Sequence, residues 1–367
     1  MPQPLDPDAA ASLLAWYRAH KRDLPWRRRA GDAYAVWISE IMLQQTTVAA
    51  VIGFYERWMA RFPTLEALAE APLDDVLHAW AGLGYYARAR NLKRCAEALV
   101  AERGGVFPSD VEALLTLPGI GRYTAGAIAS IAYERDAPIL DANVARVLSR
   151  CAPVEDDPKS ALGQAKLWDL ARASIPAGQA RDFNQAMMEL GALVCTPKSP
   201  SCGSCPISKS CAARLAGRQD ELPTGPAPKA WKSARHVSAA VARGGRLLLV
   251  QRAAEGLWGG LWEMPRVILQ PGESPEAGAA RAVRETVGLA AAAREPFGSL
   301  RHVVTDTKIT LTGYNASVER AEEAAPAACA ALAWVDPDET LAYACSTPQR
   351  KLIALWRKAR RQPALAL

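Results

Sequence analysis

Hydrophobic side chains recur at three- and four-residue intervals through most of residues 8–222, which is the pattern of helices that pack on a common core. Leu13, Leu14 and Tyr17 give one example, and Ile38, Ile41 and Met42 begin another. Proline and glycine interrupt the pattern at helix-length intervals. We therefore predict an almost wholly helical domain over residues 1–222.

The pattern changes after the proline-rich stretch 221–233, which has no periodicity and predicts a linker at 223–233. Residues 236–252 contain two strand-like runs around a Gly-Gly pair, a hairpin signal, and 302–318 alternates like a strand. One helix is expected over 275–289. The fold prediction is thus a multidomain chain: an all-α domain, an α+β domain at 234–358 and a tail at 359–367.

Composition agrees with two or three domains, because half of the 367 residues are hydrophobic. The N-terminal segment has neither a basic region nor an apolar core like a signal peptide. No apolar run approaches the roughly 20 residues of a membrane helix. These observations lead us to expect a cytoplasmic protein.

The formal net charge of +6 favours an anionic partner, but its distribution is uneven. Basic and acidic residues balance at 25 each over residues 1–225, so the excess lies in 226–367. Small basic clusters occur in the first region, at Lys21–Arg22, Arg27–Arg29 and Arg88–Arg94. Such runs belong to a solvated helix face more often than to a binding patch.

Four cysteines lie close together, in the spacing C-x6-C-x2-C-x5-C: Cys195, Cys202, Cys205 and Cys211. Four thiolates fit either a 4Fe-4S cluster or a tetrahedral zinc ion. Structural zinc sites more often use two C-x2-C pairs, so the spacing favours the iron–sulfur cluster. The other cysteines stand among apolar neighbours and are expected to be reduced, buried thiols.

Residues 114–133 predict a helix, a tight Pro-Gly-Ile-Gly turn and a second helix. Gly119 and Gly121 allow unusual backbone conformations and leave amide groups uncovered at the start of the second helix. Such amides suit a phosphate, so the segment favours a helix-hairpin-helix that holds a DNA backbone. An ordinary corner between two helices is the alternative.

Two carboxylates are candidates for chemistry. Glu40 is the only charged residue between Asp32 and Glu56, in a strongly apolar helical segment, where burial would raise its pKa and suit a general acid. Asp141 stands where another helix is expected to begin. It is either an N-cap alone or a cap placed for chemistry on bound DNA. A Glu at a helix edge is the plain alternative for Glu40.

The order and spacing of WISEIMLQQT, AGLGYYARARNL, LPGIGRYTAGAI, LDANVARVL and the four-cysteine loop resemble the adenine DNA glycosylases of the MutY type. The resemblance implies a DNA-repair hydrolase, associated with the nucleoid, that binds duplex DNA as a monomer. Its substrate would be adenine opposite 8-oxoguanine or guanine. The four cysteines of the loop 195–211 would hold a 4Fe-4S cluster.

The resemblance also implies residue roles. Glu40 matches the general acid that protonates N7 of adenine. Asp141 matches the carboxylate that stabilises the oxocarbenium-like sugar through a transient covalent bond, and Tyr123 and Asn143 match residues that support this pair. Related lyases carry a lysine where Tyr123 stands. Because a phenol cannot form a Schiff base, we predict a monofunctional glycosylase. Ala142 replaces the family's usual glycine, a change expected to be tolerated.

Further positions match residues that contact the DNA around the mispair: Gln45, Thr46, Leu83 and Tyr85. Core packing is the alternative for Tyr85, and more so for Tyr86.

Residues 234–358 resemble the Nudix-like domain that this family uses to recognise 8-oxoguanine. Glu273, Arg281, Glu285 and Gly288 fall on positions of the Nudix motif, but Ala282 and Thr286 replace metal-binding glutamates. A magnesium-dependent hydrolase needs those carboxylates, so a binding module is predicted.

Where the family commonly has Phe-Ser-His, this chain has Val304, Thr305 and Asp306. Thr305 keeps a hydroxyl for contact with the lesion, whereas Asp306 should weaken DNA binding. Three rival functions remain: a non-enzymatic iron–sulfur DNA-binding protein, a Nudix hydrolase and a pyrimidine-specific lyase.

Overall fold

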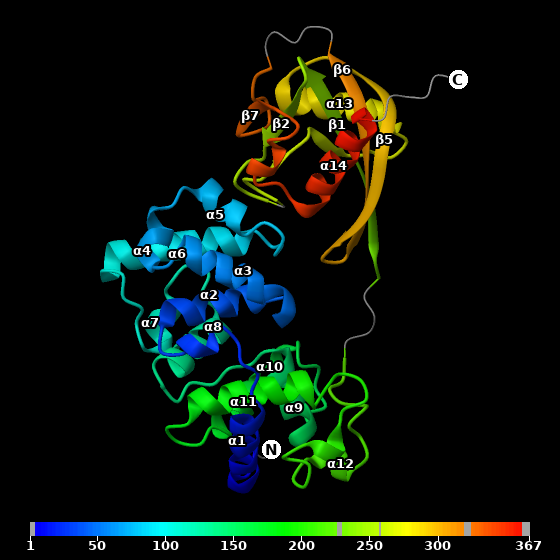
Figure 1. The fold of residues 1–367 in the computed structure, drawn as a ribbon. Coiled ribbons are helices and arrows are strands. Elements are labelled where there is room, and N and C mark those ends of the chain that lie inside the picture. Colours follow the sequence, from blue (N-terminus) through cyan, green and yellow to red (C-terminus); the bar gives the residue numbers. More distant parts are fainter. Residues whose placement is uncertain (1–3, 226–229, 257, 319–323, 362–367) are drawn as a thin grey trace. The chain divides into compact units, whose positions relative to one another are not determined.

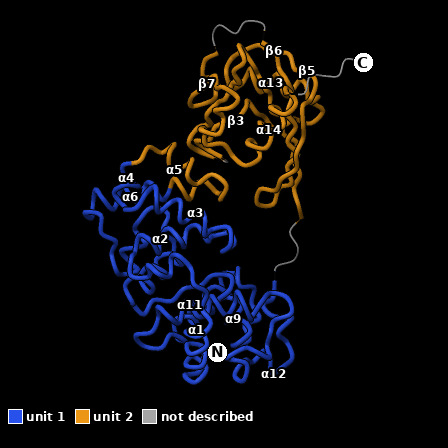
Figure 2. Tube along the Cα trace, viewed as in Figure 1, with its two compact units in different colours: residues 1–70, 91–227 blue, residues 71–90, 228–367 orange. Residues whose placement is uncertain are grey.

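The structure is a computed structural model that describes residues 4–225, 230–256, 258–318 and 324–361 (Figure 1). The chain divides into two compact units (Figure 2). Unit 1 comprises residues 1–70 and 91–227, and unit 2 comprises residues 71–90 and 228–367. Residues 71–90 therefore group with the C-terminal part of the chain.

Unit 1 is helical, as the hydrophobic periodicity predicts. Its helices are α1 (Pro7–His20), α2 (Ala33–Leu43), α3 (Val48–Arg61), α4 (Leu65–Glu70), most of α6 (Ala87–Arg103), α7 (Val111–Leu115), α8 (Arg122–Ala127), α9 (Ala142–Cys151), α10 (Ala161–Ala173), α11 (Ala180–Leu193) and α12 (Ala212–Leu215). A π-helical turn, Ile128–Ala132, continues α8. One core joins α1, α9, α10 and α11.

Helix starts in unit 1 follow local capping chemistry. The side chains of Asp6, Asp32, Asp110 and Ser160 accept a backbone N–H at the starts of α1, α2, α7 and α10. A side-chain acceptor at this position satisfies one of the amides that a helix leaves without a partner. These side chains therefore set where α1, α2, α7 and α10 begin.

Unit 2 contains α5 (Leu73–Ala79) and a mixed sheet between two helices. The strands are β1 (Lys232–Arg243), β2 (Arg246–Gln251), β3 (Trp262–Glu263), β4 (Arg266–Ile268), β5 (Ala291–Val304), β6 (Thr307–Val318) and β7 (Ala331–Val335). Their main order is β3-β2-β1-β6-β5, with β4 on β1 and β7 on β2. Only β1 and β6 pair in parallel among these strands as described.

The two sides of the sheet bury alternate residues of each strand, as a strand's two-residue period requires. One core holds Val237, Ala239 and Val241 of β1 against α13 (Pro275–Val287). The other core holds Ala240 of β1 and Leu311 of β6 with side chains of α14 (Thr347–Arg361).

The predicted elements of unit 2 are present, with one difference. The hairpin forms at Gly244 and Gly245, whose φ angles of 54° and 82° suit glycine. The single strand expected over 302–318 is instead the end of β5, a turn at Thr305–Asp306 and β6. Alternation alone missed the turn because neither turn residue is glycine or proline. Part of the predicted linker, residues 226–229, lies outside the described residues.

Among the helices that the structure describes, none is long and apolar enough to cross a membrane.

Candidate active site and cysteine-lined cavity

Glu40 lies in the middle of α2, where every residue from Tyr34 to Met42 is buried. Its side chain accepts a hydrogen bond from the Tyr123 hydroxyl of α8, which also lies 3.4 Å from the Met188 sulfur of α11. Burial raises the pKa of Glu40 to about 7, while the bond from Tyr123 acts in the opposite direction. A carboxyl group with this pKa is poised to exchange a proton near neutrality.

Asp141 is the N-cap of α9, and its two carboxylate oxygens have different partners. Oδ1 accepts the backbone N–H of Val144 at 2.7 Å, and Oδ2 accepts a bond from the Asn143 side chain at 2.9 Å. Burial raises the pKa of Asp141, and these two bonds lower it in part. The charge of Asp141 also raises the pKa of Glu40, which means that the two carboxylates influence each other.

The structure therefore brings Glu40, Tyr123, Asp141 and Asn143 to one region of unit 1 from three helices. Asn143 is held in turn by Arg146, which donates to its Oδ1 at 2.9 Å. Arg146 also donates to the carbonyls of Gly191, at 2.7 Å, and Cys195, at 2.7 Å. Arg146 thus connects the Asp141 region to the start of the cysteine loop.

The four cysteines of the loop line one cavity together with Cys151 and Arg150 of α9. All eight cysteines of the chain are free thiols. Arg150 is almost fully buried and donates to the Sγ of Cys195 at 3.2 Å and to the carbonyls of Thr196 and Leu222, each at 2.8 Å. Arg150 and Arg146 therefore both hold the cysteine loop against α9.

The thiols surround this cavity without converging on a point. Over the residues that the structure describes, no three His, Cys, Asp or Glu side chains come close enough to hold a single metal ion. Cys151 was expected to be an ordinary apolar-core thiol, and its place on the cavity wall was missed. The only sequence signal was its position one residue after Arg150, at the end of an amphipathic helix.

The helix-hairpin-helix segment has α7, a turn at residues 116–121 and α8. Gly119 has a φ of +76°, and an added Cβ would lie 2.5 Å from the Cβ of Asn91. Gly121 is different: its φ is −95°, and nothing lies within 4 Å of an added Cβ. The expectation that both glycines need unusual backbone angles is therefore wrong for Gly121, which caps α8 in an ordinary extended conformation.

The remaining predicted DNA contacts lie in turns. Gln45 and Thr46 follow the end of α2, and Gln45 is exposed with a φ of +63°. In unit 2, Tyr85 is 51% exposed with a φ of +48°, whereas Leu83 is 6% exposed. Non-glycine residues in the left-handed region cluster at functional sites. Tyr86 is buried, and its hydroxyl donates to the carbonyl of Cys345 at 3.2 Å. Tyr86 is therefore a residue of the core.

Thr305 forms the β5–β6 turn with Asp306, and its φ is +53°. Asp306 accepts hydrogen bonds from the side chains of Thr305 and Thr307. Its Oδ2 also lies 3.4 Å from the ammonium of Lys232. The hydrogen bond from Thr307 lowers the pKa of Asp306 most, and Lys232 lowers it further. The Asp306 carboxylate is therefore paired with Lys232 of β1, and its effect on DNA binding stays a prediction.

The four arginines of the N-terminal basic clusters have acidic partners. Arg22 and Arg27 both bind the buried carboxylate of Glu189, at 2.6 and 2.9 Å, while Arg28 pairs with Asp23 and Arg29 with Asp32. Burial would raise the pKa of Glu189, but the hydrogen bonds from Arg22 and Arg27 lower it to about 2. This group of two arginines around a buried carboxylate was not predicted, because Glu189 is distant in sequence from both arginines.

The Nudix-motif residues of unit 2 form a structural network. Arg281 of α13 binds Glu273 at 2.7 Å, Glu285 at 3.1 Å and the carbonyl of Ile268 at 2.9 Å. Ala282 is buried, and the hydroxyl of Thr286 donates to the carbonyl of Ala282 at 2.6 Å. The two carboxylates of the motif, Glu273 and Glu285, are thus both paired with Arg281.

Two family models match the chain. Residues 38–173 match the HhH-GPD superfamily of base excision DNA repair proteins, and residues 236–355 match the NUDIX domain. The human adenine DNA glycosylase is 39% identical over 94% of this chain and 73% of its own length. The rat adenine DNA glycosylase is 38% identical over 95% of this chain and 78% of its own length.

Among solved structures, a thermostable thymine-DNA glycosylase superposes with a TM-score of 0.51 and 30% identity. The match covers 56% of this chain and 95% of that glycosylase. It supports the assignment of the helical fold.

Proposed function

Because the chain belongs to the adenine DNA glycosylases, enzymes of base excision repair, we propose that it releases adenine paired with 8-oxoguanine or guanine through Glu40 and Asp141. The observation that carries this proposal is the burial of Glu40, whose pKa of about 7 suits a proton donor. The charge of a second carboxylate, Asp141, contributes to this raised pKa. An adenine inside duplex DNA has to leave the base stack before such a group can reach it.

The proposed reaction begins with protonated Glu40, which donates its proton to N7 of the adenine. Protonation makes adenine a better leaving group, and the bond from C1′ of the sugar to N9 breaks. The ionised carboxylate of Asp141 stabilises the positive charge that develops on the sugar. Water then adds at C1′ and gives its proton to Glu40, which restores the acid. The hydrogen bonds from Asn143 and the Val144 amide fix the Asp141 carboxylate during these steps.

Tyr123 supports a glycosylase without lyase activity. Its hydroxyl is engaged with Glu40, and a phenol cannot form the Schiff base that leads to strand cleavage. The product is then an abasic site in an intact strand.

We also propose that Cys195, Cys202, Cys205 and Cys211 hold a 4Fe-4S cluster. The fold family commonly carries one, and the four thiols surround a shared cavity. The spacing has a single C-x2-C pair, which favours the cluster over a zinc ion, because structural zinc sites more often use two such pairs. The cluster, when bound, would cross-link the loop and fix its basic residues Lys198 and Lys209 toward a phosphate backbone.

The DNA partner is proposed to be a duplex that contains the mispair. Gly119 and Gly121 would receive phosphate at the hairpin, Gln45, Thr46, Leu83 and Tyr85 would contact DNA at the mispair, and Thr305 would read 8-oxoguanine. A monomer bound to the nucleoid in the cytoplasm remains our expectation. Unit 2 is proposed to bind DNA without hydrolase activity, because Ala282 and Thr286 supply no carboxylates.

The test is single-turnover adenine release from duplexes with 8-oxoguanine:A, G:A and T:A pairs, with strand breaks revealed by alkali. We expect fast release from the first, slower release from the second and none from the third. Equal rates on the first two would contradict recognition of 8-oxoguanine by unit 2. Strand breaks without alkali, at the rate of base loss, would contradict the monofunctional mechanism.

A further inference from the structure

Among the residues that the structure describes, none covers one side of the β1–β6–β5 sheet near the Thr305–Asp306 turn. On this side α13 packs against Val237, Ala239 and Val241 of β1. Residues of β1 that precede Val237 at the same two-residue spacing are exposed: Ser233 and Arg235. The strands therefore extend past the helix that covers them.

The strand register identifies what this uncovered side presents. Ser233 pairs with Lys308 of β6, which pairs with Val303 of β5, and paired residues point to the same side of a sheet. Thr310 pairs in the same way with Arg235 and Arg301. Trp231 stands two residues before Ser233, and the Lys308 ammonium lies 5.1 Å from the centroid of its ring. We call Trp231, Arg235, Arg301, Val303 and Lys308 the Trp231 face.

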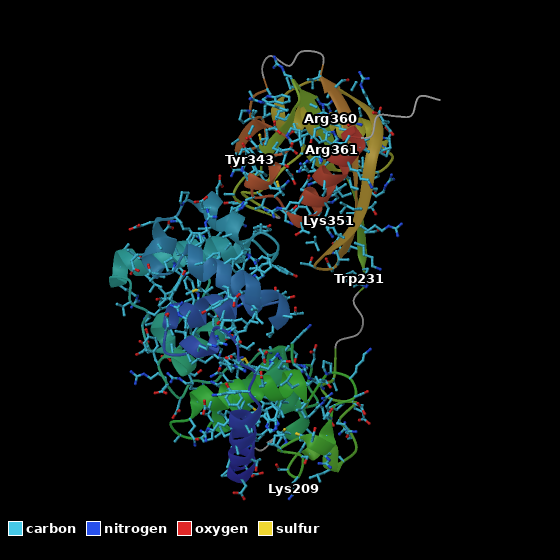
Figure 3. The ribbon with its side chains drawn as sticks, viewed as in Figure 1. Lys209, Trp231, Tyr343, Lys351, Arg360 and Arg361 are labelled. Carbon is cyan, nitrogen blue, oxygen red and sulfur yellow. The ribbon has the colours of Figure 1, made fainter. Side chains whose placement is uncertain are left out.

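The chemistry of the Trp231 face is unusual for solvent-exposed sheet. Trp231 is 57% exposed and Val303 is 56% exposed, although both side chains are apolar. Figure 3 labels Trp231 where the chain enters β1. Three cations accompany them, and none of the three forms an ion pair with a described residue. The nearby carboxylate of Asp306 is already paired with Lys232.

We propose that the Trp231 face is a docking surface for the sugar–phosphate backbone of duplex DNA beside the base read at the Thr305 turn. An exposed aromatic ring can pack against a deoxyribose, and cations beside it that form no ion pair can contact the phosphates. The charge also fits, since residues 226–367 carry 19 basic and 13 acidic residues, the whole positive excess of the chain. This inference rests on the proposed function, because that function makes DNA the ligand of unit 2.

The position of the face makes it continuous with the proposed reader. Lys232, the residue after Trp231, pairs with Thr307 and donates its backbone N–H to the carbonyl of Asp306 at 3.0 Å. A base that meets Thr305 therefore has its flanking nucleotides beside Trp231 and Lys308. The turn would supply base contact and the face would supply affinity, which is the usual division of roles in DNA recognition.

The experiment uses the full-length, cluster-containing protein and a duplex in which 8-oxoguanine is opposite a non-cleavable 2′-fluoro-adenosine. W231A is compared with W231F and with L341A, which removes a 60% exposed apolar side chain elsewhere on unit 2. We expect W231A to raise Kd about tenfold, as loss of one aromatic–DNA contact does. W231F should stay within about threefold of the wild type, and L341A should not differ from it.

The cations are tested by salt dependence. R301A and K308A should each lower the slope of log Kd against log salt by about 1, while K358A, a change on the exposed side of α14, should leave it unaltered. An unchanged Kd for W231A would overturn the proposal, as would unchanged slopes for both cation variants.

Two outcomes separate this inference from the proposed function. Adenine release by the wild type together with unchanged binding by W231A would contradict the proposed role of the Trp231 face in DNA binding but not the proposed enzyme activity. Weaker binding by W231A, in a protein whose wild type releases no adenine, would support DNA binding by the Trp231 face and contradict the proposed reaction.

Discussion

The hydroxyl of Tyr123 donates a hydrogen bond to the carboxylate of Glu40, a residue 83 positions earlier in the chain. This bond stabilises the ionised carboxylate, while burial of Glu40 stabilises the protonated form. The balance leaves the pKa of Glu40 at about 7. The first two predictions follow from this balance.

Replacement of Glu40 by Gln should abolish adenine release and stabilise the protein at high pH. The folded-state pKa of about 7 exceeds the ordinary glutamate pKa of 4.5, so folding favours the protonated acid. The contribution of that proton is complete below pH 4.5 and is lost as the pH rises to 7. E40Q should therefore gain roughly 3 kcal/mol over the wild type at pH 8 and little at pH 5. Urea denaturation at both values measures this, and an equal gain at both would contradict the raised pKa.

Replacement of Tyr123 by Phe should move the pH profile of base release toward higher pH. The change removes a bond that favours ionised Glu40, so its pKa rises further above 7. Release that requires protonated Glu40 should then persist to higher pH, although its maximal rate should fall. Single-turnover rates from pH 5.5 to 9 measure the shift. A Tyr133→Phe variant, which changes a tyrosine bonded to the Phe107 carbonyl, is the control and should leave the profile in place.

Alanine at Gly121 should weaken DNA binding without a loss of stability. Its added methyl group meets nothing within 4 Å, yet it stands at the start of α8, where we propose that amides face phosphate. Alanine at Gly119 should instead cost about 1 kcal/mol or more of stability, because the φ of +76° is strained for alanine and the added methyl group would clash with the side chain of Asn91. Thermal unfolding and Kd for duplex DNA measure both. G31A, at another open and exposed glycine, should change neither.

Replacement of Arg146 by Met should slow adenine release, on the order of 10- to 100-fold, while iron content remains. The variant keeps the volume of the side chain but removes the donors to Asn143, Gly191 and Cys195, so Asn143 no longer holds Asp141 in one orientation. R172M, at an exposed position on α10, is the matched control. Iron analysis and single-turnover rates are measured on the same preparations. A full rate in R146M would show that Asn143 positions Asp141 without help.

Replacement of Cys202 by Ser should remove the cluster and weaken DNA binding before the helices unfold. Wild-type protein should contain about four irons per chain. C151S is the matched control, because Cys151 lines the same cavity but is not one of the four proposed ligands. We expect C151S to retain iron and bind DNA normally. Loss of iron in C151S but not in C202S would reverse the assignment of ligands.

Local sequence patterns predicted most of the fold because the elements are defined by local chemistry. Helical periodicity, capping side chains and the Gly244–Gly245 turn each act within a few residues. The lone acid in an apolar segment likewise predicted the burial of Glu40 and the direction of its pKa. Its catalytic role stays a prediction.

Contacts between distant residues could not be predicted in this way. Glu189 is 167 positions from Arg22, and nothing near either residue indicates the partner. Arg146 and Arg150 resemble ordinary helix cations, although both are buried and hold the cysteine loop. The ion pair between Asp306 and Lys232 could not be predicted either, because the sequence does not show that β1 runs beside the turn.

The two bonds of Asp141 bear on how this position can change in evolution. One oxygen starts α9 and the other faces Asn143, so a single side chain serves both folding and the proposed chemistry. Asn or Ser could replace the cap at little energetic cost, whereas neither supplies a carboxylate. Selection for a folded protein alone would therefore tolerate these residues. A lineage that kept the DNA-binding scaffold but abandoned base removal could lose this aspartate by one substitution and leave the rest of the domain intact.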